Sequence, residues 1–298
     1  MKKFSLFVVR TLSRVFALLP IRVQLLFGDM IGLLWFDLLR IRRKVALDNL
    51  KRCFPNWAES KRVSVARASV CNLGRSFIEF LRIPVVASTV NEKSQWKDHF
   101  DIQGLEHLEN ALNKGRGVCL LSAHIGNGDW GTVGLALHGI QLHIISKEFK
   151  LRWLNDLWFE TRQSLGSQFI SDRGSALAIL KLLKKNKIVV FVLDQFMGPP
   201  IGIKTKFFGY ETGTPVGLSL LADRSGAAVV PIYTYRKPDG RTGLVFEPEI
   251  VYAGSEVENK DIMLQNMTQS YCDKIEEWVR LYPEQWMWVH RRWKKYKH

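Results

Sequence analysis

The sequence predicts an α/β fold: a single mixed, largely parallel sheet flanked by helices on both faces, with an N-terminal membrane-associated helical region. Short apolar runs alternate with helical segments through the second half of the chain, which is typical of this class. One run, 187–193 (KIVVFVL), is continuously apolar, as suits a strand covered on both faces. Hydrophobic residues make up 47% of the 298 residues and charged residues 24%, which is ample for a buried core.

The first fifty residues are expected to form membrane-associating helices, with residues 51–298 forming one further domain. In 1–19, Lys3, Arg10 and Arg14 share one side of a helix and apolar residues occupy most of the rest. A second apolar segment, 23–36, ends in a basic run. Charges interrupt both segments before the roughly 18 to 20 apolar residues that a spanning helix needs. The pattern favours helices that lie in a membrane interface, and the alternative is two amphipathic helices that cover a soluble core.

The elements of the sheet follow a region, 45–113, that is expected to be mostly helical. A Gly-rich turn follows the first strong strand, and Pro238-Asp239-Gly240 is expected to turn one late strand into the next. The predicted strands are 117–123, 142–146, 168–171, 187–193, 227–235 and 244–248. One predicted helix follows the Gly-rich turn and ends at 137, and two others span 175–185 and 215–224.

Charge and cysteine content narrow the classes of function. The 43 Lys and Arg exceed the 28 Asp and Glu, so the net charge is +15 and an anionic partner or surface is expected. A nucleic-acid-binding protein is the rival from another class, but no helix-turn-helix, zinc finger or RNA-binding motif is visible and the cations flank apolar helices. The four cysteines are isolated, so neither a metal site nor a disulfide framework is expected and a reducing compartment is indicated.

The most informative segment is 122–131 (SAHIGNGDWG). It places His124 where a buried strand ends, three glycines in the turn, and Asp129 at the beginning of a helix. Catalytic groups of open α/β sheets gather at the carboxyl ends of strands. A turn would let Asp129 fold back and accept the Nδ1 proton of His124, leaving Nε2 to take a proton from a substrate hydroxyl. The alternative is that Asp129 is a helix N-cap and His124 a structural histidine.

Two further features have both functional and structural interpretations. Asn127 and the backbone N–H groups of Gly128 and Asp129 are candidates for an oxyanion hole at the helix N-terminus. Four tryptophans lie among the last 21 residues, beside several cations, which suits either a lipid headgroup boundary or helix packing. They are Trp278, Trp286, Trp288 and Trp293. The histidines His138, His143 and His290 are expected to be structural.

A family resemblance rests on three segments. The His-x4-Asp pattern after an apolar strand resembles the signature of the lysophospholipid/glycerolipid acyltransferase superfamily, and SAHIGNGDWG resembles its bacterial lipid A biosynthesis acyltransferase branch. The block from Lys206-Phe-Phe-Gly to Ser225-Gly-Ala-Ala-Val-Val-Pro231 is similar to the central part of that branch. The end, Pro283-Glu-Gln-Trp-Met-Trp-Val-His-Arg-Arg-Trp-Lys294, is similar to its C-terminus. Together they cover residues 115–294 in the order of the family.

The resemblance implies that residues 51–298 are an acyltransferase domain that moves a fatty acyl chain to a hydroxyl of a lipid A precursor. The acyl donor would be acyl carrier protein, or else coenzyme A, as a thioester co-substrate with no other cofactor. The enzyme would lie peripherally or monotopically on anionic lipid at the cytoplasmic face of the inner membrane. His124 would be the general base and Asp129 its partner. Lipid A enzymes commonly carry Glu at the second position, so a glycolipid, lysophospholipid or mannoside lipid stays open as acceptor. The alternative function without catalysis is that of a membrane scaffold.

The resemblance also suggests roles for residues outside this motif. Arg173 stands where the family places a cation near the active site, to hold an acceptor phosphate or the oxyanion, unless it is a solvated turn residue. Lys147 is a candidate phosphate contact or a surface lysine. Asp194 is expected to support a catalytic residue from behind or to position the acceptor, unless it caps a turn. Phe207 and Phe208 are candidates for an acyl pocket or for the core.

Overall fold

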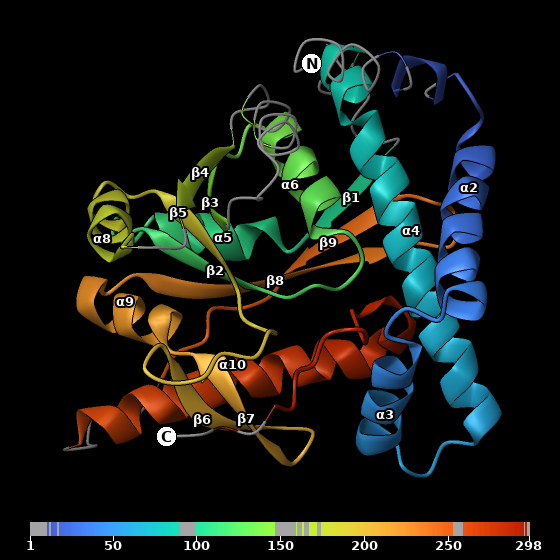
Figure 1. Ribbon diagram of the computed structural model, residues 1–298. Helices are drawn as coiled ribbons and strands as arrows, with labels where there is room; N and C mark the ends of the chain where they lie inside the picture. The colour runs from blue at the N-terminus through green and yellow to red at the C-terminus, as the bar shows by residue number, and fades with distance from the viewer. Residues whose placement is uncertain are drawn as a thin grey trace.

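The computed structural model describes residues 11, 13–16, 18–89, 99–146, 159, 163, 167–171, 174–252, 259–294 and 296. Its centre is a seven-stranded sheet in the order β1-β9-β8-β2-β5-β3-β4 (Figure 1). Five strands are parallel, whereas β9 is antiparallel to β8 and carries β1 parallel to itself at the edge. The strands are β1 (Phe100–Gln103), β2 (Val118–Ser122), β3 (Leu142–Ser146), β4 (Gln168–Ser171), β5 (Ile188–Val192), β8 (Ala228–Arg236) and β9 (Thr242–Phe246). The predicted mixed, largely parallel sheet is confirmed.

Helices cover both faces of this sheet (Figure 1). On β2, Val118 and Leu120 pack into the core that contains α5 (Leu105–Leu112) and α6 (Gly128–Leu137). Cys119 and Leu121 alternate with them and pack into the opposite core. This second core contains α8 (Ala176–Lys184), α9 (Gly217–Ser225) and α10 (Lys260–Leu281). Because side chains of a strand alternate between faces, a continuously apolar strand fills both cores.

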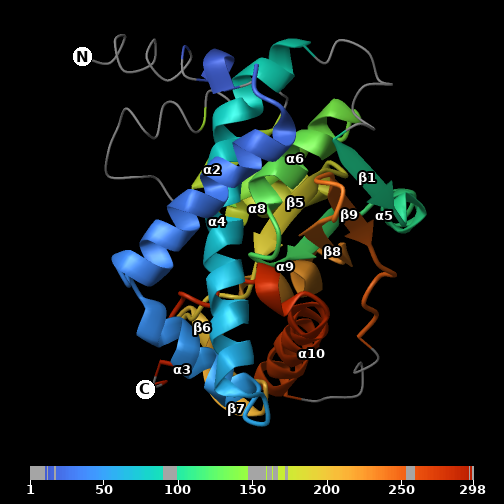
Figure 2. The ribbon, with the colours of Figure 1, turned by 90° about the vertical axis from the view of Figure 1, so that its right-hand side faces the viewer.

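The N-terminal helices form a separate layer at one end of the sheet. The chain runs through α2 (Ile21–Leu33), a π-helical turn η1 (Leu34–Leu38), α3 (Arg43–Cys53) and the long α4 (Glu59–Thr89). Helices α2 and α4 cross in close contact (Figure 2). A Cβ added at Gly28 of α2 would come within 2.5 Å of the Arg75 Cα of α4, so only glycine permits this approach. Within the described residues, no helix combines the length and the apolar character needed to cross a membrane.

Two features differ from the sequence prediction. The edge strand β1 lies inside the region expected to be mostly helical, and its alternating apolar and polar residues fit an edge position. An antiparallel hairpin of β6 (Gly202–Phe207) and β7 (Tyr210–Pro215), which the sequence analysis did not predict, packs beside α10. The amphipathic pattern of residues 1–10 lies outside the described residues.

Candidate active site

The centre of the site is a pair formed by His124 and Asp194. His124 lies two residues after β2, and Asp194 lies two residues after the neighbouring strand β5. The imidazole Nδ1 is 2.7 Å from Asp194 Oδ1, and the His124 backbone N–H donates to Asp194 Oδ2 at 2.9 Å. Since adjacent parallel strands end at the same edge of a sheet, residues 70 positions apart in the chain meet here.

Asp194, and not Asp129, is the hydrogen-bond partner of Nδ1, so the predicted His124–Asp129 hydrogen bond is wrong. Nδ1 carries a single hydrogen. The Asp194 carboxylate, which can only accept hydrogen bonds, accepts the one that this hydrogen makes. Helix α6 begins at Gly128 and its N-cap is Asn127, so Asp129 lies in the first helical turn and is not the cap either. Asp129 acts on His124 as a nearby negative charge that helps to raise its pKa.

The electrostatics of the pair suit a proton acceptor. Burial would raise the pKa of Asp194, whose side chain is 1% exposed, but His124 and hydrogen bonds lower that pKa to about 2. Burial would lower the pKa of His124, and the Asp194 carboxylate reverses this and raises it above the ordinary value. Asp194 is therefore ionised at neutral pH and keeps the proton on Nδ1. The Nε2 lone pair is left to accept, and the Gln195 side-chain amide lies 3.4 Å from it.

His124 borders a cavity of about 320 Å³ that extends between α6 and the sheet. The 122–129 loop lines its polar part with His124, Gly128 and Asp129. A Cβ added at Gly128 would meet no atom within 4 Å, so the start of α6 faces open space. Most of the remaining lining is apolar and comes from α6 and five strands, with Leu120, Leu135, Leu142, Ile144, Val190, Ile232 and Leu244 among its residues. The cavity thus joins a polar site with a hydrocarbon-lined space.

Asn127 has a structural role in place of the predicted oxyanion contact. Its Oδ1 accepts from the Trp130 backbone N–H at 3.2 Å, which caps α6. Its amide donates to the buried Glu79 carboxylate at 2.8 Å and to the Ser76 carbonyl at 3.4 Å. Both amide hydrogens are therefore used inside the protein, and the prediction of an Asn127 side-chain donor is wrong. The backbone N–H groups of Gly128 and Asp129 remain the predicted donors.

The other predicted site residues lie in different places. Phe207 and Phe208 are buried in the core on the α10 face of the sheet and are not among the residues that line the cavity. The acyl-pocket prediction for them is wrong, because the β6–β7 hairpin carries both rings against aromatic side chains of the second core. Their ring partners are Trp286, Trp293 and Phe54. Arg173 and Lys147 lie outside the described residues.

The C-terminal aromatic residues are core residues. Trp278, Trp286 and Trp288 are buried, so helix packing, and not a lipid headgroup boundary, explains these three. His290 accepts the Phe196 backbone N–H at Nε2, and His143 contacts the Ile188 carbonyl, so both are structural as predicted.

Comparison with known proteins identifies the family of the chain. The sequence model of the bacterial lipid A biosynthesis acyltransferase family matches residues 1–295. The chain is 26% identical over 287 residues to the lipid A biosynthesis lauroyltransferase of Escherichia coli K12, covering 93% of this chain and 87% of that protein. It is 27% identical over 282 residues to the E. coli lipid A biosynthesis palmitoleoyltransferase, covering 93% and 86%. It is also 25% identical over 231 residues to the phosphatidylinositol mannoside acyltransferase of Mycolicibacterium smegmatis, covering 76% and 71%. The chain belongs to the bacterial lipid A biosynthesis acyltransferase family and is an acyltransferase that acts on lipid A or related lipids.

Proposed function

We propose that the protein transfers a fatty acyl chain from an acyl thioester, with acyl carrier protein as donor, to a hydroxyl of a lipid A precursor. The observation that carries the proposal is the His124–Asp194 pair at the border of an apolar cavity. Two E. coli relatives that span nearly the whole chain are named for lipid A biosynthesis, which supports the acceptor. The excess of positive charge suits an acidic carrier protein.

In this reaction the acceptor hydroxyl attacks the thioester carbonyl directly. His124 Nε2 takes the hydroxyl proton as the C–O bond forms, and ionised Asp194 stabilises the resulting imidazolium. The backbone N–H groups of Gly128 and Asp129, at the start of α6, are the proposed donors to the oxyanion. The C–S bond then breaks and the imidazolium returns the proton to the departing thiolate. The thioester is already activated, so it is the one co-substrate that this scheme requires.

The apolar part of the cavity is the proposed site of the acyl chain. Its volume is at the lower end of the range for small-molecule pockets, and most of the side chains that α6 and the sheet supply around Ile144 and Val190 are aliphatic. A fatty acyl chain bound there would place its carbonyl carbon beside His124. This site replaces the one predicted at Phe207 and Phe208.

A mannoside lipid, another glycolipid or a lysophospholipid is the alternative acceptor. The M. smegmatis relative, named as a phosphatidylinositol mannoside acyltransferase, supports this alternative, as does Asp at position 129. Arg173 and Lys147 stay the predicted contacts for an acceptor phosphate.

The test incubates the protein in detergent with lauroyl or myristoyl carrier protein and a tetra-acylated lipid A precursor, followed by mass spectrometry of the lipid. A gain of one acyl chain is expected with lipid A precursor, and less or none with a mannosylated phosphatidylinositol or a lysophospholipid. Preferred acylation of either alternative would overturn the acceptor, and thioester hydrolysis without any acylated lipid would overturn acyl transfer to all three.

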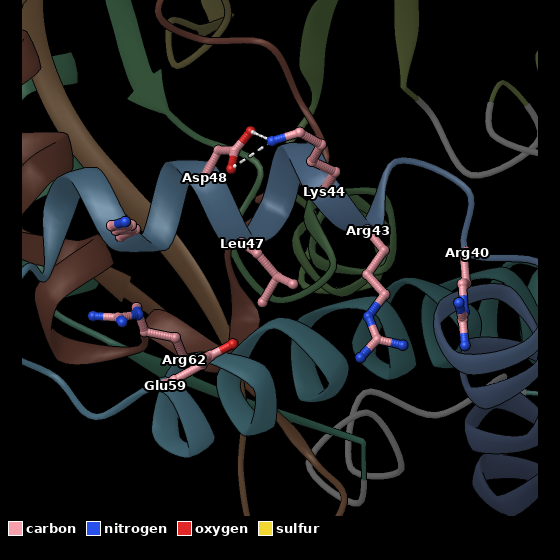
Figure 3. Close-up of a pocket in the computed structure, with 8 residues that line it drawn as sticks. Arg40, Arg43, Lys44, Leu47, Asp48, Glu59 and Arg62 are labelled. Carbon is pink, nitrogen blue, oxygen red and sulfur yellow. Dashed lines mark hydrogen bonds and ion pairs between the residues drawn. The ribbon is translucent and has the colours of Figure 1, made fainter.

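The N-terminal layer is the proposed membrane contact, at the cytoplasmic face of the inner membrane. Apolar side chains are exposed from the turn before α2, along α2 and η1, and into the turn after η1, among them Leu18, Leu26, Met30, Leu34, Leu38, Leu39 and Ile41. A groove of about 580 Å³ between α3 and the start of α4 adjoins this turn and is lined by Arg40, Arg43, Lys44, Lys51 and Arg62, together with Leu47, Asp48 and Glu59 (Figure 3). Exposed apolar side chains beside a basic groove suit a surface of anionic lipid.

Leu38→Asp should weaken binding to vesicles that contain phosphatidylglycerol by about tenfold or more, because Leu38 is 73% exposed and would insert into the lipid. Leu177→Asp is the matched control, since Leu177 is 74% exposed on α8, far from the N-terminal layer (Figure 1). Co-sedimentation with phosphatidylglycerol vesicles measures binding, and vesicles of phosphatidylcholine alone should bind less. Equal losses in the two variants, or none, would contradict the proposed membrane face.

A further inference from the structure

The loop that carries Asp194 is held by side chains of the C-terminal segment 283–293. The loop follows β5 and has no regular secondary structure of its own. Three successive residues of the loop each contact one side chain of the segment. Trp286 Nε1 donates to Asp194 Oδ2 at 2.8 Å, Arg292 donates to the Gln195 carbonyl at 3.1 Å, and Phe196 N–H donates to His290 Nε2 at 2.9 Å.

The same segment also holds the loop that carries His124. The Gly126 N–H donates to the Gln285 carbonyl at 3.1 Å, and Ile125 pairs with Trp286 in an antiparallel bridge. Asn72 of α4 donates to the carbonyls of both Gly126 and Gln285. One C-terminal segment therefore holds both halves of the His124–Asp194 pair, the His124 loop through its backbone and the Asp194 loop through its side chains, although 70 residues separate the two along the chain.

Trp286 fixes the rotation of the Asp194 carboxylate. Oδ2 accepts two hydrogen bonds, from the His124 backbone and from the Trp286 indole, and Oδ1 is left to face Nδ1. The carboxylate is buried, so water has little access to replace a lost donor. Without the indole N–H, a single backbone bond would hold Oδ2, and the carboxylate could turn away from Nδ1 or accept its proton at a poorer angle.

Arg292 and His290 also hold the loop that carries Asp194. Arg292 is buried, and its guanidinium also donates to the Gly213 carbonyl and the Thr214 hydroxyl, which ties the Asp194 loop to the β6–β7 hairpin. Burial lowers the pKa of His290 to about 4, so its Nε2 is unprotonated at neutral pH and can accept from Phe196.

We infer that Trp286 is a positioning residue for acyl transfer. Its indole N–H orients Asp194 and thereby fixes the tautomer and the direction of His124. The inference rests on the proposed role of His124 as the general base. It gives the C-terminal segment, which is distant from the His-x4-Asp motif in sequence, a direct part in assembling the site.

The test compares Trp286→Phe with Trp288→Phe. Both tryptophans are buried, and their ring centroids are 4.6 Å apart. Each substitution removes one indole hydrogen bond, and the bond lost in Trp288→Phe is the one to the Pro283 carbonyl at 2.6 Å. At matched folded fraction, Trp286→Phe should lower kcat about 10- to 100-fold with the KM of donor and acceptor unchanged. Trp288→Phe should keep kcat within about threefold of the wild type.

A second readout is independent of activity. The Nδ1 proton of His124, bonded to a carboxylate, should give a downfield proton NMR signal that is absent in His124→Gln. The signal should persist in Trp288→Phe and shift upfield or broaden in Trp286→Phe. Equal kcat losses in the two Trp variants, or an unaltered signal and kcat in Trp286→Phe, would overturn the inference. If His124→Ala itself keeps full activity, the proposed base is wrong and the inference falls with it, whereas an inactive His124→Ala with a fully active Trp286→Phe refutes the positioning role alone.

Discussion

Asp194→Asn should lower kcat by about 10²- to 10⁴-fold, as should His124→Ala, whereas Asp129→Asn should lower it by less than about tenfold. Two donors, the His124 backbone N–H and the Trp286 indole, converge on the Oδ2 position of Asp194. They require an oxygen there, so the NH₂ group of the substituted amide side chain would face Nδ1. The imidazole would then carry its proton on Nε2 and could not accept one from the substrate.

The small effect expected for Asp129→Asn follows from the same geometry. Nδ1 is already bonded to Asp194, and Asp129 influences the pKa of His124 through its charge from the first turn of α6. Steady-state kinetics with saturating carrier protein, at folded fractions matched by circular dichroism, compare the variants. A larger loss in Asp129→Asn than in Asp194→Asn would restore the pair that the sequence spacing predicts.

The pH dependence gives a second measure of the same pair. A histidine base works when neutral, so kcat/KM should fall as the pH drops through the pKa of His124, which Asp194 raises above the ordinary value. In Asp194→Asn this raised pKa is lost, and the acid limb of the residual activity should move to lower pH. Asp129→Asn should move the limb in the same direction by less, because its charge is the smaller contribution. An acid limb that is unchanged in Asp194→Asn would contradict the assignment.

The sequence located His124 but not its partner, for a physical reason. An apolar run that ends in a histidine and a Gly-rich turn is a local signal, and β2 and α6 form as this signal predicts. The pairing with Asp194 depends on β5 lying next to β2, which is a property of strand order. The acidic residue directly after KIVVFVL was a usable signal, since it marks the end of a second buried strand, but the spacing of Asp129 favoured the nearer carboxylate.

The sequence also did not predict where several aromatic side chains pack. Phe207 ends β6 and Phe208 follows it, yet the β6–β7 hairpin carries both rings to the α10 face, away from His124. The C-terminal tryptophans suited a lipid boundary by composition, but α10 buries Trp278 in the core, and the chain after α10 buries Trp286 and Trp288 where it returns to the loop that carries His124. Both outcomes follow from which surfaces meet in three dimensions.

Glu79→Ala should lower the free energy of unfolding by about 3–5 kcal/mol, the largest stability effect expected in the described part of the chain. Glu79 of α4 and Arg236 of β8 are both buried and form a bidentate ion pair, one bond of which, Nη2 to Oε2, measures 3.0 Å. Removing the carboxylate would leave the guanidinium buried, and among the described residues its remaining side-chain acceptor would be Asn72 Oδ1, at 3.3 Å. A buried charge without its partner is far more costly than the loss of the contact itself.

Urea unfolding of Glu79→Ala, with Asp48→Asn as control, measures this effect. Asp48 pairs with Lys44 at 2.9 Å on the exposed side of α3, so its loss should cost less than about 1 kcal/mol. The double variant Glu79→Leu with Arg236→Met should recover part of the loss, because it removes the buried Arg236 guanidinium together with its partner, while Arg82 and Asn127 still lose Glu79. A Glu79→Ala loss no larger than that of Asp48→Asn would show that the pair is solvated. Glu79 also accepts from Asn127, the N-cap of α6, so the same substitution should loosen the turn that presents His124 and lower kcat in the molecules that remain folded.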